Sequence, residues 1–355
     1  MKDVLDDLKI IKTSQSRLPQ VDLSNLTFGS VFSDHMFVVD YIDGQWQEPR
    51  IMPYGPLPME PGAKVFHYGQ AVFEGMKAFK DEQGNVFLFR PEMNFERINR
   101  SAWRLAMPQI PEEFFMGGIK KLIELDKDWI PDGEGASLYI RPVYIATENQ
   151  IAASVSRNYR FMIITSPAQS YFSGEVKVKI EKRYTRACHG GVGSAKAAGN
   201  YAAQFMPTQQ ARKEGYKQLI WTDSKTHELI EESGAMNLFF RIGDEICTSP
   251  LYDTILPGVT RDSLLTLGRD HGLDIKERKI TVTELVEAAE KGELKEIFGS
   301  GTAVTVLPIV GFGYEDKYYP TPQLDNPLWS VLKQMLMDIQ YNRAPDPYGW
   351  RVKVL

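Results

Sequence analysis

A single lysine, Lys196, stands in a stretch of almost nothing but small residues between positions 190 and 201. Glycine, alanine and serine fill most of this stretch, and we expect such short side chains to leave open space around the ammonium group. A lysine that acts as a nucleophile or forms a Schiff base needs this access. A solvent-facing lysine on a glycine-rich loop would have the same sequence, so the stretch by itself is compatible with both arrangements.

Four further segments carry groups that one cofactor could use together. Glu231 and Glu232 enter an apolar strand, where a carboxylate needs a cationic partner because burying it alone is costly. Residues 256–261 place a Pro-Gly turn before a helix, and the free amides of a helix N-terminus favour phosphate. Residues 299–303 form a small turn with hydroxyl groups, and residues 66–75 place aromatic side chains beside glycines. A lysine, a phosphate site and a buried carboxylate together are what pyridoxal phosphate requires.

Several other kinds of site are excluded by spacing. The phosphate-binding P-loop needs a glycine directly before its lysine, but Ala195 stands there, and Lys196 itself occupies the last glycine position of a dinucleotide fingerprint. No GxSxG elbow is present, and the five histidines show no zinc-ligand spacing, so we expect no metal. Cys188 and Cys247 are far apart in sequence, which indicates neither a disulfide framework nor a structural zinc site.

Length and composition describe a water-soluble protein of two domains. The chain has 355 residues, which is longer than a single hydrophobic core usually supports. Its 43% hydrophobic and 25% charged content is typical of globular proteins, and a net charge of −5 gives no reason to expect nucleic acid or an anionic membrane as partner. No apolar run approaches the ~20 residues of a membrane span, and the charged N-terminus has no secretory segment. We therefore expect a cytoplasmic protein.

The elements that must position these groups alternate between strands and helices in the first half of the chain. Strand patterns occur at 37–42, 86–90 and 160–165, and a helical period runs over 94–106. On that helix Arg97, Arg100 and Arg104 share one face, for which exposure to solvent is the default expectation. Residues 166–174 are rich in turn formers and form the candidate connection between domains.

The second half is richer in strands. A helix is expected from Thr260, as its N-cap, to about residue 272, and Thr281 and Glu284 form a capping box for another. The strand patterns lie at 176–180, 218–222, 227–231, 236–241 and 245–248. The whole chain is thus predicted to have a mixed α/β fold, with a first domain over 1–168, a connecting loop over 169–177 and a second domain over 178–355.

The chain resembles the branched-chain amino acid aminotransferases of the fold-type IV pyridoxal-phosphate family, in their longer form. The resemblance covers nearly the whole chain, and it rests on ordered segments at family-like spacing: 28–37, 73–80, 139–142, 199–201, 236–239, 256–261 and 338–341. It implies a small N-terminal α/β domain, a larger C-terminal pseudobarrel domain that binds the cofactor, and a homodimer.

The same resemblance implies roles for the cofactor residues. Lys196 would hold pyridoxal 5′-phosphate as a Schiff base and then serve as base and acid of the 1,3-proton shift. Glu232 would pair with the pyridine nitrogen, and Tyr201 would donate to the phenolic oxygen of the ring. The other residues that match cofactor contacts of the family, chiefly around the phosphate, are Arg97, Leu256, Val259, Thr260 and Thr302.

Substrate contacts are carried over in the same way. An aromatic wall without an inward cation suits leucine, isoleucine and valine, and the second substrate pair would be 2-oxoglutarate and L-glutamate. The wall would comprise Phe28, Tyr68, Phe73, Tyr139 and Tyr171, and the substrate carboxylate would meet Arg141 and the backbone amides of Ala235 and Ala303. Plain core packing is the alternative for any one of these aromatics.

The sequence departs from the family at two points. Val304 and Leu307 stand where mammalian members carry a redox-sensitive CxxC pair, so we expect no thiol switch. Ala235 stands where a threonine is common, and its backbone donor survives that change.

Three alternatives remain open. A D-amino acid aminotransferase or an aminodeoxychorismate lyase would keep Lys196 and Glu232, but both are usually shorter. A binding protein that kept the fold without activity is the second alternative, and the intact Lys196, Glu232, Tyr201 and Arg97 argue against it. Another phosphate-cofactor enzyme, such as a nucleotide binder, is the third, and uptake of pyridoxal phosphate would separate it from the others.

Overall fold

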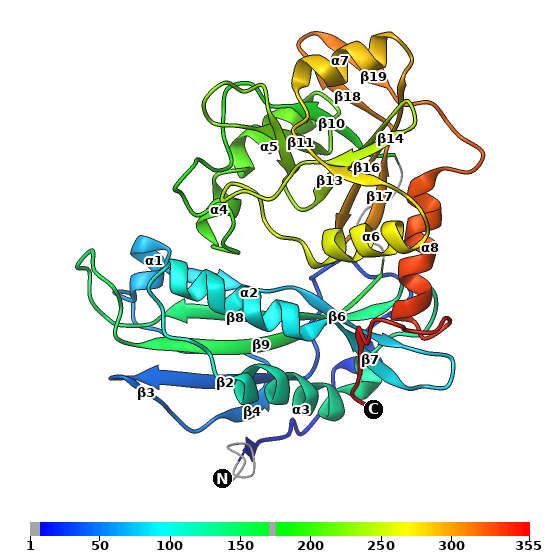
Figure 1. Cartoon of the computed structure of the whole chain (residues 1–355). Coiled ribbons are helices and arrows are strands. Elements are labelled where there is room, and N and C mark those ends of the chain that lie inside the picture. The colour runs from blue at the N-terminus through cyan, green and yellow to red at the C-terminus, as the bar shows by residue number, and fades with distance from the viewer. Residues whose placement is uncertain (1–7, 170–174) are drawn as a thin grey trace. The chain divides into compact units, whose positions relative to one another are not determined.

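The computed structural model describes residues 8–169 and 175–355, and this part of the chain forms two compact units (Figure 1). Of the described residues, unit 1 contains 8–169, 195–199 and 339–355, and unit 2 contains 175–194 and 200–338. The chain therefore leaves unit 1, returns to it for the short segment around Lys196, and returns to it again for its last residues.

Unit 1 is built on one ten-stranded sheet, whose longest pair is β8 (Ser137–Ala146) and β9 (Tyr159–Ala168). These two strands are rich in β-branched and aromatic residues, which suit a pleated surface packed on a core. All neighbouring strands run antiparallel except β1 and β4. The other strands are β1 (Lys9–Ile10), β2 (His35–Ile42), β3 (Gln45–Trp46), β4 (Arg50–Pro53), β5 (Ala71–Phe73), β6 (Met76–Lys80), β7 (Val86–Phe89) and β20 (Arg351–Lys353).

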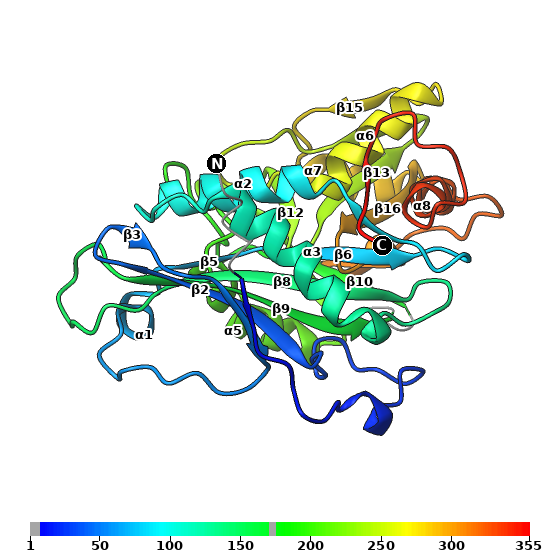
Figure 2. The same ribbon diagram turned by 90° about the horizontal axis from the view of Figure 1, so that it is seen from below.

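Two helices, α2 (Pro91–Arg104) and α3 (Gly118–Leu125), pack with this sheet around one apolar core (Figures 1 and 2). Ile98 of α2 and Leu122 of α3 are fully buried in that core. Gly118 lets α3 approach the sheet, because a Cβ there would lie only 3.1 Å from the ring of Phe37. The shorter helical segments of unit 1 are η1 (Leu18–Gln20), α1 (Lys64–Tyr68), η2 (Glu113–Gly117) and η3 (Lys127–Trp129).

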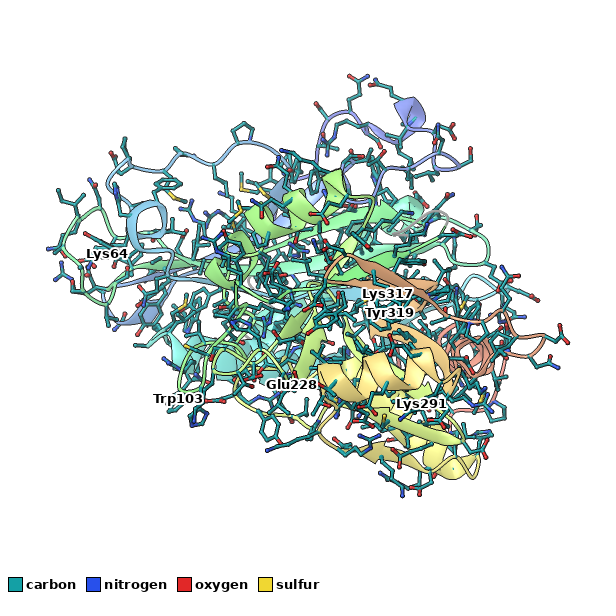
Figure 3. All side chains as sticks on the ribbon, turned by 90° about the horizontal axis from the view of Figure 1, so that it is seen from above. Lys64, Trp103, Glu228, Lys291, Lys317 and Tyr319 are labelled. Carbon is teal, nitrogen blue, oxygen red and sulfur yellow. The ribbon has the colours of Figure 1, made fainter. Side chains whose placement is uncertain are left out.

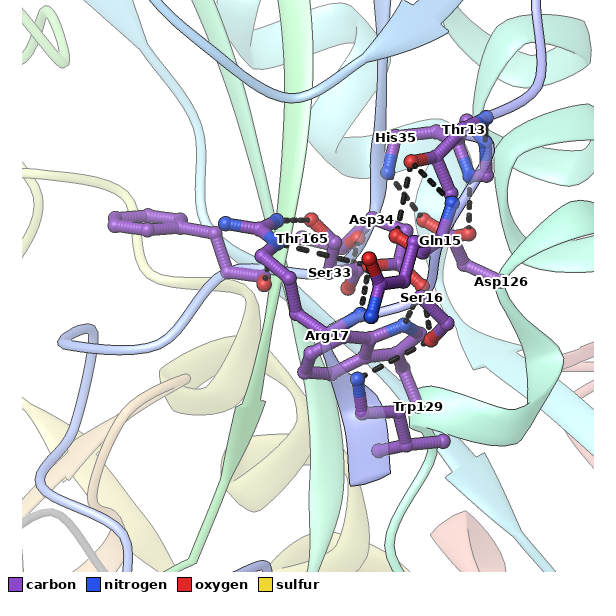
Figure 4. A network of polar contacts seen from close by, with 12 residues as sticks. Thr13, Gln15, Ser16, Arg17, Ser33, Asp34, His35, Asp126, Trp129 and Thr165 are labelled. Atoms are coloured by element: carbon purple, nitrogen blue, oxygen red, sulfur yellow. Dashed lines mark hydrogen bonds and ion pairs between the residues drawn. The ribbon is translucent and has the colours of Figure 1, made fainter. Parts of the chain in front are cut away.

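A polar network holds the N-terminal segment of unit 1 in place (Figure 4). The carboxylate of Asp34 accepts hydrogen bonds from the Ser16 hydroxyl (2.6 Å), the Arg17 amide (3.0 Å) and the Trp129 indole N–H (2.9 Å). Ser16 and Arg17 precede Phe28 in the chain and Asp34 follows it. The network thus fixes the chain on both sides of one of the predicted substrate residues.

Unit 2 contains two five-stranded sheets. In the first sheet β10 runs parallel to both of its neighbours, and in the second the rings of Phe239 and Phe298 stack across the β13–β16 pair at 5.1 Å. The first sheet comprises β10 (Lys177–Ile180), β11 (Gln218–Thr222), β12 (Ile230–Ser233), β18 (Gly311–Tyr314) and β19 (Lys317–Pro320). The second comprises β13 (Asn237–Ile242), β14 (Glu245–Thr248), β15 (Ile275–Glu277), β16 (Leu294–Gly301) and β17 (Thr305–Ile309).

Five helices complete the second half of the chain. Helix α7 is joined to β19 by an ion pair between Glu290 and Lys317 (2.6 Å), and the Lys317 ammonium also lies 4.7 Å from the ring centre of Tyr319 (Figure 3). The helices are α4 (Gly199–Ala202), α5 (Phe205–Lys213), α6 (Val259–Asp270), α7 (Val282–Glu290) and α8 (Leu328–Gln340). None of the helices in the described ranges combines the length and the apolar character needed to cross a membrane.

Most of the predicted elements are confirmed, including the strands at 37–42, 218–222 and 245–248 and the helix over 94–106. The capping box is confirmed too, since the Thr281 hydroxyl accepts the Glu284 amide at 2.9 Å.

Two boundaries were wrong. Thr260 lies inside α6, whose N-cap is Gly258, where a Cβ would lie 2.1 Å from the side-chain oxygen of Asn237. The strand expected at 227–231 starts only at Ile230, because the Asp223 carboxylate binds the amides of Glu228 and Leu229 in a loop.

The division into units differs from the expected domains in two segments. Residues 195–199 pair with β5, and β20 extends the sheet of unit 1 beside β7, so both belong to unit 1 although they come late in the sequence. With these segments, unit 1 holds more residues than unit 2.

Candidate active site

The Lys196 segment is held in unit 1 by backbone hydrogen bonds to β5. The Phe73 amide donates to the Lys196 carbonyl (3.0 Å), and the Ala198 amide donates to the Ala71 carbonyl (3.0 Å). The Lys196 amide in turn donates to the Ser101 hydroxyl of α2 at 2.9 Å. The backbone of the lysine is therefore fixed from two sides, and its half-buried side chain places Nζ 5.1 Å from the ring centre of Phe73.

Four of the predicted substrate residues lie together in unit 1, and we call them the Phe73 cluster: Phe28, Phe73, Tyr139 and Arg141. The rings of Phe28 and Tyr139 meet edge to face at 4.9 Å, and the Arg141 guanidinium lies 4.6 Å from the ring centre of Phe73. Arg141 also donates from Nη2 to the Tyr139 hydroxyl (3.0 Å), while its buried Nε has no hydrogen-bond partner. The cluster thus offers an apolar surface with one cation whose orientation is fixed.

Of the two remaining aromatics, the structure describes Tyr68, and Tyr68 is not part of this cluster. Tyr68 lies on α1, where its hydroxyl donates to the carbonyl of Ile151, and the residue is 44% exposed. Tyr171 lies outside the described residues, so its predicted role stays a prediction.

Arg97 is buried, whereas Arg100 and Arg104 are exposed, so the default expectation of a solvated face fails for the one arginine with a predicted role. Its Nε and Nη2 donate to the two carboxylate oxygens of Glu74 at 2.7 and 2.8 Å. The opposite face of α2 carries Trp103, which is 74% exposed (Figure 3). Helix α2 therefore presents one polar, buried face and one face to solvent.

Burial would raise the pKa of the fully buried Glu74, but Arg97 acts in the other direction. The charge and hydrogen bonds of Arg97, with the charge of Lys196 and a hydrogen bond from Asn94, lower the pKa of Glu74 below its usual range. Glu74 is thus an ionised carboxylate inside unit 1.

In unit 2 the buried carboxylate of Glu232 is bound by three groups, which we call the Glu232 cage. Arg186 Nη2 lies 2.7 Å from one oxygen, Asn237 Nδ2 donates at 3.0 Å, and the Leu256 amide donates at 3.2 Å. Arg186 is itself held by the carbonyls of Gly193 and Thr254. The predicted need of this carboxylate for a cationic partner is met by Arg186.

Its neighbour Glu231 has a different environment. Burial raises the pKa of Glu231 above its usual range, against a hydrogen bond from Thr254 and the charge of Arg186, and one of its oxygens has no hydrogen-bond partner. Both oxygens of Glu232 therefore have hydrogen-bonding or ionic partners, whereas one oxygen of Glu231 has none.

The N-terminus of α6 follows directly from Leu256 of the Glu232 cage. Val259 and Thr260 are buried in its first turn, and Gly258 caps the helix without a side-chain hydrogen bond. Amides at such an end attract anions, more so where no side-chain oxygen competes. This geometry supports the predicted phosphate contacts of Val259 and Thr260.

Two turns of unit 2 that carry predicted site residues are in contact with each other. Ala235 is in the β12–β13 turn, and Thr302 and Ala303 are in the β16–β17 turn. A Cβ on Gly301 would lie 2.9 Å from the Ala235 carbonyl oxygen, so the two turns are in contact. Between the strands they join, the buried hydroxyl of Ser300 has no hydrogen-bond partner. Tyr201 lies on α4 in unit 2, and its side chain is half-buried.

The small residues around Lys196 do not all provide open space. A Cβ on Gly199 would meet nothing within 4 Å, as expected, but one on Gly193 would lie 2.6 Å from Ala187 and 2.7 Å from Thr254. Gly193 therefore serves close packing beside Arg186, and this part of the expectation was wrong.

Comparison with known proteins identifies the family. A model described as amino-transferase class IV matches residues 71–312. The chain is 44% identical over 352 residues to branched-chain-amino-acid aminotransferase 2 of Bacillus subtilis, covering 97% of this chain and 96% of that protein. It is 40% identical over 342 residues to a branched-chain-amino-acid aminotransferase of Mycolicibacterium smegmatis, covering 94% and 93%. The chain belongs to the class IV aminotransferases.

Solved structures confirm the predicted fold class for this class IV aminotransferase. The branched-chain aminotransferase of Thermoproteus uzoniensis, solved with norvaline, matches with a TM-score of 0.75 at 24% identity, covering 90% of this chain and all of that one. The holo-form enzyme of Thermobaculum terrenum matches with a TM-score of 0.74 at 20% identity, covering 91% and 98%.

Sequence reasoning missed the residues that support those it named. Glu74 stands inside the family-like segment 73–80 and Arg186 precedes Lys196 by ten positions, but neither was given a role. The only available signal was that a buried carboxylate and a buried arginine need partners, and sequence does not say which ones pair. The other missed supports are Asn94, Ser101 and Asn237.

Proposed function

We propose that this class IV aminotransferase uses pyridoxal 5′-phosphate to transfer the amino group between a branched-chain L-amino acid and 2-oxoglutarate, giving the branched-chain 2-oxo acid and L-glutamate. The names of its relatives support the reaction class and the substrate class. The observation in this chain that carries the proposal is the ammonium of Lys196 beside the ring of Phe73, because it joins the reactive amine to an apolar surface.

The residues present fit this cofactor. The α6 N-terminus has no side-chain cap, and Ser300 offers a buried hydroxyl without a partner, as a phosphate-binding region requires. Arg97, Val259, Thr260 and Thr302 would hold the phosphate, and Leu256 would pack on the ring. When bound, the cofactor supplies an electron-withdrawing ring that stabilises negative charge at the substrate Cα.

Lys196 would move the proton. Its Nζ would take the proton from the substrate Cα and later give it back, and the flexible four-carbon stem would let one amine serve as both base and acid. The fixed backbone on either side limits that movement to the side chain, since the Lys196 amide and carbonyl are both hydrogen-bonded.

Glu232 would hold a proton on the ring nitrogen of the cofactor. A carboxylate fixed by Arg186, Asn237 and the Leu256 amide cannot turn away, and its negative charge favours a protonated nitrogen opposite it. Tyr201 would donate to the phenolic oxygen of the ring.

The substrate side chain would lie against the Phe73 cluster, with Tyr68 and Tyr171 completing the wall. One methylene changes binding by only about 1–3 kcal/mol, so leucine, isoleucine and valine are all suitable. The carboxylate would meet Arg141 and the amides of Ala235 and Ala303, in the two turns that are in contact.

We also propose a cytoplasmic homodimer. Support comes from an exposed apolar surface on α1 and the segment that it contacts, where large hydrophobic side chains would gain from a partner: Phe66 (63% exposed), Tyr68, Ile151 (72%) and Val155. Dimerisation would cover this surface, and sedimentation of the purified protein tests it.

The test of the reaction is an absorbance spectrum of the purified protein before and after L-leucine is added. We expect a visible or near-ultraviolet band of the bound cofactor that converts to the band of the pyridoxamine form. A band that does not change with L-leucine but does change with D-alanine would instead identify a D-specific aminotransferase. A colourless protein that takes up no added pyridoxal 5′-phosphate would refute the proposal.

A further inference from the structure

The carboxylate of Glu74 is enclosed by hydrogen-bond donors although the proposed reaction assigns it no role. Arg97 donates to it from Nε (2.7 Å) and Nη2 (2.8 Å), Asn94 Nδ2 donates at 2.8 Å, and the Gly75 amide donates at 3.0 Å. The side chain is fully buried. We call this arrangement the Glu74 cage.

One face of α2 builds the cage and connects it to the reactive lysine. Asn94, Arg97 and Ser101 follow one another at helical spacing and are all buried. The Ser101 hydroxyl donates to the Arg97 carbonyl (2.8 Å) and accepts the Lys196 amide (2.9 Å). Glu74 directly follows Phe73, whose amide donates to the Lys196 carbonyl (3.0 Å). The phosphate arginine, the lysine and the substrate wall therefore share one rigid support.

We propose that Glu74 is a positioning residue that fixes the guanidinium of Arg97 in the orientation needed to bind the phosphate of the cofactor. The inference rests on the proposed function, because it requires a phosphate-bearing cofactor.

The two hydrogen bonds from Arg97 to Glu74 make it possible to distinguish an effect on the orientation of Arg97 from an effect on its charge. A carboxylate beside a phosphate-binding arginine cancels part of the positive charge, so a site that worked by charge alone would be weakened by Glu74. A grip by two parallel hydrogen bonds fixes the plane of the guanidinium, which a single contact would leave free to turn. Orientation predicts that loss of Glu74 weakens phosphate binding, whereas charge predicts that it strengthens it.

The test compares two ligands, pyridoxal 5′-phosphate and pyridoxal, which lacks the phosphate. Their affinities for the full-length protein, freed of cofactor by dialysis, are measured by absorbance titration in the wild type, Glu74→Gln and Glu74→Asp. We expect the preference for the phosphorylated ligand to fall on the order of 10-fold in both variants, the size of one weakened charge-assisted hydrogen bond. Asp keeps the charge but shortens the side chain, so it should not rescue.

A milder variant tests the same inference even if the Glu74 variants do not fold. Asn94→Ala leaves Glu74 and Arg97 in place but removes one of the cage donors, and alanine suits a helix. We expect a loss of phosphate preference in the same direction, about threefold.

The control is another buried carboxylate of unit 1. Glu148 forms an ion pair with the buried Lys64 (3.0 Å) and has no contact with Arg97 in the described structure. Glu148→Gln should lower stability while leaving the preference for the phosphorylated ligand unchanged.

An unchanged or increased preference in both Glu74 variants would overturn the inference, and so would rescue by Asp. Failure of the wild type itself to bind pyridoxal 5′-phosphate would refute the proposed function instead, so the two failures are distinguishable.

Discussion

The two units each bury one glutamate in a cage of the same composition. Glu74 in unit 1 is bound by an arginine, an asparagine and a backbone amide, and so is Glu232 in unit 2. The difference lies in what holds the arginine. Arg97 donates hydrogen bonds to both oxygens of Glu74. Arg186 forms an ion pair with Glu232 and also donates to the backbone carbonyls of Gly193 and Thr254.

This difference reverses the roles within the cages. In unit 1 the carboxylate orients an arginine, so we infer that the arginine is the group that meets the ligand. In unit 2 the arginine is anchored to the backbone and orients the carboxylate, so the carboxylate is the group that acts.

The largest predicted loss of activity is at Lys196, whose backbone is held by Ser101 on the same helix that builds the Glu74 cage. We expect Lys196→Ala to reduce transamination by about 10⁴-fold or more, because the substrate proton loses its proposed acceptor, while the fold persists. The measurement is turnover of L-leucine with 2-oxoglutarate, together with circular dichroism. Lys291→Ala, which removes an exposed ion pair on α7, is the control and should keep full activity. Retained turnover in Lys196→Ala would exclude this lysine.

A smaller effect is expected at Glu232. Glu232→Ala should lower kcat by roughly 100- to 1,000-fold, since the ring nitrogen loses its anionic partner while the other cofactor contacts remain. Single-turnover spectra with L-leucine would show slow conversion of the bound cofactor. Near-normal rates would mean that Glu232 is not the carboxylate that acts, and Glu231→Gln would then be the next variant to measure.

The sequence predicted the acting groups far better than their supports. Lys196 and Glu232 are marked by their surroundings, a run of small residues and an acidic pair entering an apolar strand, and the family pattern names both. Glu74 and Arg186 carry no such mark, because their partners Arg97 and Glu232 lie 23 and 46 positions away and only the folded chain pairs them.

The fold was predicted in a similar way. Local patterns placed strands and helices correctly where side-chain period decides them, as in 94–106 and 218–222. They misplaced boundaries that depend on distant contacts, such as the N-cap of α6 at Gly258, where a Cβ would collide with the side chain of Asn237. The return of residues 195–199 to unit 1 also depends on pairing with β5, which no local pattern reports.

The third prediction tests the unit 2 cage through stability. Arg186→Met would leave Glu232 buried without its cation and the carbonyls of Gly193 and Thr254 without their donor. We expect the free energy of unfolding to fall by about 3 kcal/mol, as measured by urea denaturation. The exposed Arg183→Met is the control, with a change below about 0.5 kcal/mol. Equal stability of the two variants would mean that Arg186 does not hold this carboxylate in solution.

The smallest effect concerns a buried pair that lacks the full cage. Glu148 accepts hydrogen bonds from the amide and Nε of Arg157, both at 2.9 Å, and pairs with Lys64, but no asparagine joins it. Burial opposes ionisation, yet these partners lower the pKa of Glu148 to about 2. A lowered pKa stabilises the fold above the ordinary value of 4.5, and the contribution is lost as the pH falls toward about 2.

Glu148→Gln should therefore cost up to roughly 2 kcal/mol of unfolding free energy at pH 7 and progressively less between pH 4.5 and 2. Urea denaturation of wild type and variant across this range is the measurement. If the difference in unfolding free energy between wild type and variant stays constant with pH, the contribution of Glu148 comes from packing rather than from its charge. A difference that vanishes in acid, with activity unchanged at pH 7, would place this pair with the structural ion pairs.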